Sequence, residues 1–145
     1  MFFLPLVELL RDTVESEMAV GVNHRSSRWG EYAKQFLAYG DGRIVAGDYS
    51  KYDKYMDTLD IEEALLILVR FAKKCGYDER SLRIMRTAIT DLSLPSLMVN
   101  NDVCTVQGTN PSGQPITVEV NCIINSIYMR CVWIVLCTKH KTERS

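Results

Sequence analysis

The chain has 145 residues, of which 47% are hydrophobic and 24% charged, a composition typical of a folded globular domain and unlike that of a disordered chain. Its formal net charge is −1, whereas nucleic-acid-binding proteins are usually basic, so composition alone argues weakly against a nucleic-acid partner. Five scattered cysteines without C-x-x-C spacing favour reduced, mostly buried thiols in a cytosolic protein over a zinc site or a disulfide framework.

The N-terminal part of the chain is predicted to form two helices joined by a loop. Residues 2–6 are apolar, but they follow no basic lead-in and precede no small-residue cleavage site. An amphipathic helix is therefore favoured over a signal peptide. Residues 21–27 are predicted to be a loop, and residues 28–39 a short helix.

The next segment contains two aspartates that are candidates for chemistry. Residues 43–48 show little polar alternation, as in a strand covered on both faces, and Asp48 stands where this predicted strand ends. Oxygen ligands at such a position suit Mg²⁺, so Asp48 is a candidate metal ligand. A turn after Asp48 could bring Asp53 beside the same cleft. The alternative is an Asx-type turn, in which both carboxylates only accept hydrogen bonds from the backbone.

Two further helices are predicted in the middle of the chain. The first has Asp60 as its N-cap, Glu63 three residues later as the capping-box partner, and Gly76 as its stop signal. A second helix then begins after Asp78, which is the predicted N-cap. The apolar residues of the first helix are spread so widely around it that the helix is expected to be largely buried.

A hairpin and a loop are predicted to follow. Residues 94–99 and 103–107 have the composition of two strands joined through residues 100–102. The loop of residues 108–115 is rich in Gly and Pro and leads directly into a long apolar segment. Ser112 and Gly113 are thereby placed at the entrance of the next helix.

That helix, residues 116–136, carries one polar stripe. Thr117, Asn121 and Asn125 recur at intervals of four residues on an otherwise apolar body. Uncharged hydroxyls and amides indicate a stripe that faces a confined polar cleft, where a ligand is recognised without burying a charge. The alternative is a helix whose modest polar residues face a neighbouring strand or water. Charged and amide residues interrupt the apolar segment, which makes it a poor membrane span.

Together these two segments resemble the RNA-directed RNA polymerases of positive-strand RNA viruses, most closely the picorna-like group. Residues 47–53 resemble the palm motif A of that family, and residues 108–126 resemble motif B with its S-G-x-x-x-T-x-x-x-N spacing. The resemblance covers residues 19–130. The Gly-Asp-Asp of motif C and the basic segment that grips the triphosphate are absent. Residues 1–145 are therefore expected to be a single internal fragment of a polymerase catalytic domain.

The resemblance implies an α+β fold, a partial right-hand palm with adjoining fingers helices, helix-rich with a small antiparallel sheet. It implies template-directed nucleotidyl transfer by two metal ions, Mg²⁺ or alternatively Mn²⁺, with Asp48 as the catalytic metal ligand. It assigns Asp53, Ser112 and Asn121 to recognition of the ribose, with Thr117 supporting them and Gly113 allowing the loop to move.

The implied partners are an RNA template-primer, ribonucleoside triphosphates and the remainder of the polymerase polyprotein. The implied location is a replication complex in the host cell cytoplasm, and no transmembrane segment is expected. An alternative is a non-catalytic, polymerase-derived remnant that binds nucleotide or RNA. Because motif C is missing, the residues present are expected not to synthesise RNA alone. An unrelated α+β domain would require both motif resemblances to be coincidental.

Overall fold

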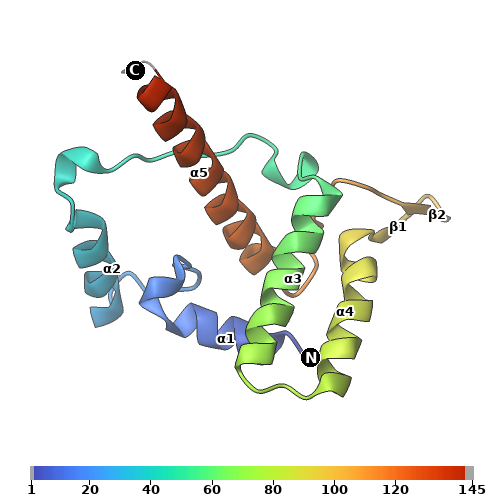
Figure 1. Ribbon diagram of the computed structural model, residues 1–145. Coiled ribbons are helices and arrows are strands. Elements are labelled where there is room, and N and C mark those ends of the chain that lie inside the picture. Colours follow the sequence, from blue (N-terminus) through green and yellow to red (C-terminus); the bar gives the residue numbers. More distant parts are fainter. Residues whose placement is uncertain (1, 143–145) are drawn as a thin grey trace.

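The computed structural model describes residues 2–142, without the side chains of residues 53 and 140–142. The described part is helix-rich and contains one two-stranded antiparallel sheet, so the predicted α+β class is confirmed. Figure 1 shows α3 at the centre, flanked by α4 and α5, with α1 across one end and α2 at the side. The elements are α1 (Leu4–Asp12), α2 (Ser27–Leu37), α3 (Thr58–Lys74), α4 (Glu79–Ser93), β1 (Ser96–Val99), β2 (Asp102–Thr105) and α5 (Thr117–Thr142).

The hydrophobic core lies where α3 packs against α4, α5 and α1. One face of α3 contributes six buried residues, because apolar side chains recur along it at helical spacing. Helices α1, α4 and α5 each present a narrower apolar stripe to this face, as α4 does with Leu82, Met85 and Ile89. The buried residues of α3 are Ile61, Ala64, Leu65, Leu68, Val69 and Ala72. The predicted burial is therefore confirmed for one face of α3, whereas Leu66 and Phe71 are only partly buried.

The start of α3 differs from the prediction. Asp57 is the N-cap, and its carboxylate accepts a hydrogen bond from the Leu59 backbone N–H at 2.8 Å. Asp60, the predicted cap, lies in the first turn and accepts a hydrogen bond from the Tyr128 hydroxyl. Two aspartates three residues apart can each cap a helix, and the earlier one adds a turn of backbone hydrogen bonds. The predicted cap of α4, Asp78, is confirmed by a 2.7 Å hydrogen bond from the Ser81 N–H.

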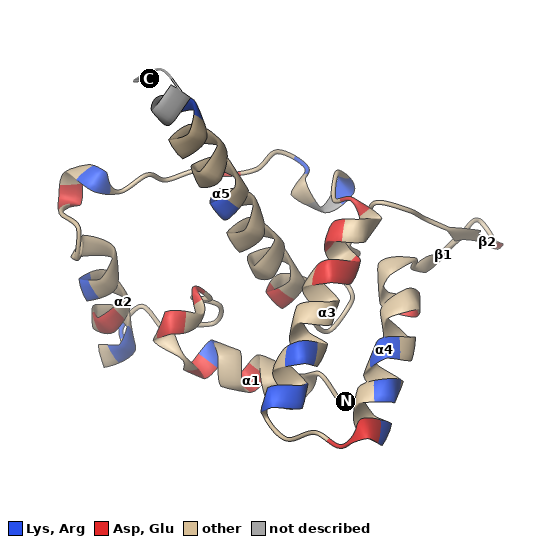
Figure 2. Ribbon diagram, in the orientation of Figure 1, with Lys and Arg blue, Asp and Glu red and all other residues tan. Residues whose placement is uncertain are grey.

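Charges on α3 follow the helix dipole. Figure 2 shows acidic residues near its N-terminal end and basic residues near its C-terminal end. Asp60 lies in the first turn, and Lys73 and Lys74 lie in the last. Both arrangements favour the helix electrostatically. Gly76, with φ +87°, follows the helix as the predicted stop signal.

The predicted hairpin is present with a shorter turn. Its register pairs Ser96 with Thr105 and Val99 with Asp102, so Asp102 belongs to β2 and not to the turn. Only Asn100 and Asn101 remain as turn residues, with φ of +50° and +70°. A two-residue turn with positive φ at both positions matches the twist of a hairpin, and Asn tolerates this conformation.

The predicted strand of residues 43–48 is wrong. The short 3₁₀ turn Asp41–Arg43 is followed by an extended segment that pairs with no strand of the described chain. Ile44 is 52% exposed and Val45 is 91% exposed, so the segment is covered on neither face. A strand needs a neighbour to satisfy its backbone groups, and apolar residues alone do not provide one. The cysteine prediction also needs correction: all five thiols are free, but none is buried.

Helix α5 begins as predicted and continues further than predicted. Its first turns pack in the core, and its second half projects away from the other helices (Figure 1). The span Thr117–Lys139 is long and apolar enough to cross a membrane by length and composition, which is weak evidence by itself. The absence of a membrane span therefore stays a prediction.

Candidate functional site

The loop before α5 is folded back over the first turns of that helix. Asn110 is buried, and its side-chain amide donates to the Thr117 carbonyl at 3.2 Å and to Asn121 Oδ1 at 2.7 Å. The Thr117 hydroxyl donates to the Pro111 carbonyl at 2.6 Å. Two residues of the polar stripe therefore hold the loop in place.

The segment that contains Asp48 lies against the same stripe. The Tyr52 hydroxyl donates to the Asn121 main-chain carbonyl at 3.2 Å, and the Tyr49 hydroxyl donates to Asn125 Oδ1 at 2.9 Å. The two tyrosine rings are stacked, with centroids 4.6 Å apart and an interplanar angle of 27°. In Figure 1 this segment crosses α5 on its way to α3. The two segments singled out in the sequence are thus in direct contact.

Asp48 itself is exposed at this contact. Its Oδ1 accepts a hydrogen bond from the Tyr49 backbone N–H at 2.9 Å, a local contact of the kind expected for the Asx-turn alternative. Because the carboxylate lies at the surface, it is accessible to a ligand as well. The described residues contain no group of three or more His, Cys, Asp or Glu side chains that could enclose a metal ion. Mg²⁺ commonly binds one or two carboxylates plus waters and phosphates, so Asp48 fits a contribution of one ligand.

The other predicted site residues are placed less fully. Ser112 and Gly113 lie in the exposed turn that precedes α5. Gly113 does not have a positive φ, and a Cβ there would meet nothing within 4 Å, so this conformation by itself does not require glycine. Asp53 belongs to the 3₁₀ turn Tyr52–Lys54, directly after the Tyr52 contact, and its side chain lies outside the described residues.

Three residues of the site were not singled out from the sequence: Tyr49, Tyr52 and Asn110. The available signal is the pair of tyrosines three residues apart, but their spacing does not indicate which residues they contact. Tyr52 is half-buried, and its pKa is raised to about 12, mainly by burial and then by the neighbouring Tyr49, Cys122 and Asp60. Its hydroxyl is therefore protonated at neutral pH and able to donate.

A buried ion pair fixes the first turns of α5 from the opposite side. Glu119 has no solvent exposure, and its Oε1 lies 2.6 Å from Nε and 2.5 Å from a terminal nitrogen of Arg11 in α1. Its second oxygen, Oε2, is buried without a hydrogen-bond partner. The sequence pointed to Glu119 only as an interruption of an apolar segment. The pair links α1 to α5 within one turn of Asn121.

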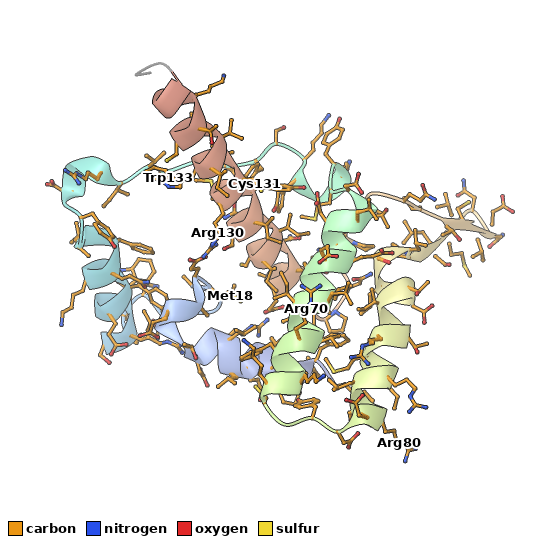
Figure 3. The ribbon with its side chains drawn as sticks, in the orientation of Figure 1. Met18, Arg70, Arg80, Arg130, Cys131 and Trp133 are labelled. Atoms are coloured by element: carbon orange, nitrogen blue, oxygen red, sulfur yellow. The ribbon has the colours of Figure 1, made fainter. Side chains whose placement is uncertain are left out.

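A second polar cluster lies further along α5. The Arg130 guanidinium reaches the loop after α1 (Figure 3), where it contacts both carboxylate oxygens of Glu17 at 2.8 and 3.1 Å. The Ser126 hydroxyl donates to Glu17 Oε2 at 2.6 Å. These bonds lower the pKa of Glu17 and raise that of Arg130. An open groove of about 570 Å³ runs beside the cluster and extends to Trp133.

Comparisons with known proteins agree with the motif resemblance. A family model described as viral RNA-dependent RNA polymerase matches residues 1–144. The chain is 28% identical to the replicase polyprotein of Cricket paralysis virus over 98% of its own length, and 29% identical to that of Drosophila C virus (strain EB) over 92%. It is 32% identical to the RNA1 polyprotein of Broad bean wilt virus 2 over 83% of its length.

The chain spans only 8%, 8% and 6% of these three polyproteins. No solved structure matches it significantly. The family model nevertheless covers nearly every residue, and the first two relatives match more than nine tenths of the chain. The chain therefore belongs to the family of viral RNA-dependent RNA polymerases, and its resemblance to the picorna-like group is confirmed.

Proposed function

We propose that the chain is a segment of a picorna-like viral RNA polymerase and supplies part of the active site for template-directed nucleotidyl transfer. The observation that carries this proposal is the contact between the Asp48 segment and α5, made by the hydroxyls of Tyr49 and Tyr52. It brings together the two segments that resemble motifs A and B, although they are far apart in the sequence. Because the chain belongs to the polymerase family, nucleotidyl transfer is the reaction expected of such a site.

In this proposal Asp48 is a ligand of the catalytic metal, Mg²⁺ or Mn²⁺. Its exposed carboxylate has the accessibility that such a role requires. When bound, two such ions stabilise the attacking and leaving oxygens of the transferred phosphoryl group. The described residues provide one carboxylate for that purpose, so the remaining protein ligands would come from another part of a longer polymerase.

The ribose is assigned to the loop and first turns of α5. Asn121 and Thr117 stand on the polar stripe, and Ser112 and Gly113 stand in the turn before it. Asp53 follows the Tyr52 contact in sequence and completes the proposed set. Amide and hydroxyl groups can both donate to and accept from a 2′-hydroxyl, and a carboxylate can accept from it. The 2′-hydroxyl distinguishes a ribonucleotide from a deoxyribonucleotide. The implied partners are an RNA template-primer, ribonucleoside triphosphates and the rest of the polymerase, acting in replication complexes of the host cytoplasm.

The test is Asp48→Asn in a polymerase that contains this segment. We expect Mg²⁺-dependent primer extension to fall by more than about 100-fold, because the amide keeps the shape but loses the charge that binds the metal. Asp41→Asn is the matched control, since Asp41 also accepts a hydrogen bond from the N–H of the next residue, Gly42, at 2.8 Å. Near-normal extension by the Asp48 variant would remove it from the metal site.

A second candidate function is a non-catalytic remnant that binds nucleotide or RNA. It is favoured by the local hydrogen bond that Asp48 accepts from the Tyr49 backbone N–H, a contact that needs no metal. Both candidates expect no synthesis from the 145-residue chain alone. They differ in the longer polymerase, where only the first expects activity to depend on Asp48.

A further inference from the structure

We infer that Tyr49 and Tyr52 are positioning residues, which hold the Asp48 segment on α5 through their two hydroxyls and their stacked rings. The inference rests on the proposed function, because the residue that the two tyrosines position is the proposed metal ligand, Asp48. Neither tyrosine is taken to touch substrate or metal.

The first step concerns the backbone around Asp48. Residues 44–50 form neither helix nor strand, and all of them are exposed. No ladder of backbone hydrogen bonds therefore fixes the position of Asp48. Lys51 has a φ of +56°, in the left-handed region, within a turn between the two tyrosines. Other contacts must hold the segment, and the structure gives it the two tyrosine hydroxyls.

The second step concerns the geometry of the attachment. Asn121 and Asn125 are four residues apart on α5, so the two residues that supply the acceptors lie on the same face of the helix. The two tyrosines reach these acceptors from positions three residues apart, with their rings stacked on each other. Two anchoring points fix both the place and the direction of the segment along the helix, which a single hydrogen bond would not do.

The third step concerns desolvation. Tyr52 is half-buried against α5, and burial of a hydroxyl without a partner is unfavourable. Its acceptor is a main-chain carbonyl of α5, Asn121 O, so the bond follows the helix backbone and not a mobile side chain. The raised pKa of Tyr52 agrees with this burial.

The fourth step connects the pair to the proposed chemistry. Tyr49 directly follows Asp48, and Tyr52 is bound to the residue assigned to the ribose, Asn121. The pair therefore sets the distance between the proposed metal ligand and the proposed ribose contact. Its loss should let Asp48 drift while the loop before α5 stays in place, because Asn110 holds that loop independently. The rate of chemistry should then fall more than nucleotide affinity.

A double-mutant cycle in the 145-residue chain tests the contact itself. Tyr49→Phe and Asn125→Ala are made singly and together, and the unfolding equilibrium is measured in urea. We expect a coupling of about threefold to tenfold in the unfolding constant, the range for one hydrogen bond. Additive effects would overturn the inference.

The second arm uses a polymerase that contains this segment. We expect the Tyr49→Phe/Tyr52→Phe variant to lose about tenfold or more in kcat, with KM for nucleotide changed by less than about threefold. Tyr32→Phe is the matched control, because it also loses a hydroxyl bond to a main-chain carbonyl, Met18 O at 2.9 Å, away from the site. Its kcat should stay normal.

The outcomes of this arm separate the two proposals. Unchanged kcat in the double tyrosine variant, with Asp48→Asn inactive, would overturn the positioning role and leave the proposed function standing. An equal loss of kcat in Tyr32→Phe would also overturn it, since the effect would then follow stability alone. A fully active Asp48→Asn variant would instead overturn the proposed function, and the positioning role with it.

Discussion

Glu119 is a carboxylate without solvent exposure, and it depends on one partner. Its Oε1 is bound by Arg11, whose side chain is 40% exposed, and its Oε2 has no partner. Burying a charge in this way costs desolvation energy, which a single guanidinium repays only in part. The pair therefore orients α1 against α5 without adding much net stability.

The first stability prediction follows from the dependence of the buried Glu119 carboxylate on Arg11. Arg11→Ala should lower the free energy of unfolding by about 3 kcal/mol, because it leaves a buried carboxylate uncompensated. Adding Glu119→Gln to Arg11→Ala should recover part of that loss, since the amide carries no charge. Urea denaturation of the three variants measures both effects.

The matched control is Arg70→Ala, which breaks an exposed pair with Glu63 at 3.5 Å. Such surface pairs contribute little, so its free energy of unfolding should change by less than about 1 kcal/mol. Equal losses in Arg11→Ala and Arg70→Ala would contradict the buried character of the first pair.

The raised pKa of Tyr52 predicts that the stability of the folded chain decreases at alkaline pH. Its pKa rises from the ordinary 10.0 to about 12 in the folded chain, so the unfolded chain releases this proton first. The stabilisation is complete below pH 10 and is lost as pH rises toward 12. The pKa of Tyr128 is raised as well, by burial and by Asp60, and acts in the same direction.

Urea midpoints measured between about pH 9 and about pH 11 check this prediction. The free energy of unfolding should fall across that interval, by less than about 2 kcal/mol for Tyr52, because the ring is only partly buried and solvent screens the effect. The slope should be shallower in Tyr52→Phe. An identical slope in Tyr52→Phe would show that the Tyr52 hydroxyl has the same pKa in the folded and unfolded chain.

At the scale of elements, α5 is divided into two unlike halves. Ile116, Val120 and Ile124 enter the core near its start. Five consecutive apolar residues in its second half, the apolar band of residues 132–136, are exposed by 49% to 69%. Figure 3 shows Trp133 on this projecting half. Exposed apolar surface of this kind tends to associate.

We therefore predict that the 145-residue chain self-associates through the apolar band. The variant Val132→Glu/Leu136→Lys should weaken self-association by at least about tenfold, because it places charges in the band while its i, i+4 pair supports the helix. Sedimentation velocity over a concentration series measures the change.

The control variant is Tyr39→Glu/Val45→Lys, which makes the same charge changes at residues that are 78% and 91% exposed outside α5. It should associate like the unmodified chain. If both variants weaken self-association equally, the effect comes from the added surface charges in general and not from the loss of the apolar band.

Elements that are held by local hydrogen bonds can be predicted from the sequence, whereas elements that need distant hydrogen-bond partners cannot. α4 and the hairpin were predictable because their signals are local: Asp78 caps its own helix, and Asn100 and Asn101 suit their own turn. The start of α3 was misplaced by one turn, since both Asp57 and Asp60 satisfy the local rule. The strand prediction for residues 43–48 was wrong because a strand requires a neighbouring strand, which no local sequence pattern indicates.

The candidate site was predictable in its parts and not in its assembly. The polar stripe of α5 followed from helical spacing, and Thr117 and Asn121 do face the preceding loop. The stripe's contacts with Tyr49 and Tyr52 join residues 76 and 69 positions apart, and no periodicity indicates such pairing. The buried pair of Glu119 was missed for the same reason.

At the scale of the whole molecule, the contacts separate into near and distant ones. α3 and α4 are consecutive and pack directly on each other. By contrast, Arg11 meets Glu119 across 108 residues, and Glu17 meets Arg130 across 113. The first part of the chain is thus held to the rest by the packing of α1 on α3 and by these two ion pairs with α5, which follows the other described elements in the sequence.

That order has a consequence during synthesis on the ribosome. Contacts between neighbouring elements form early, whereas contacts of long sequence separation wait for the last partner. The contacts between α3 and α4 can form before α5 has been translated, but until then the tyrosines that hold the Asp48 segment lack their acceptors on α5. A nascent chain interrupted before α5 would therefore carry the proposed metal ligand on a loose segment, and this chain's part of the proposed site would form only once α5 is present.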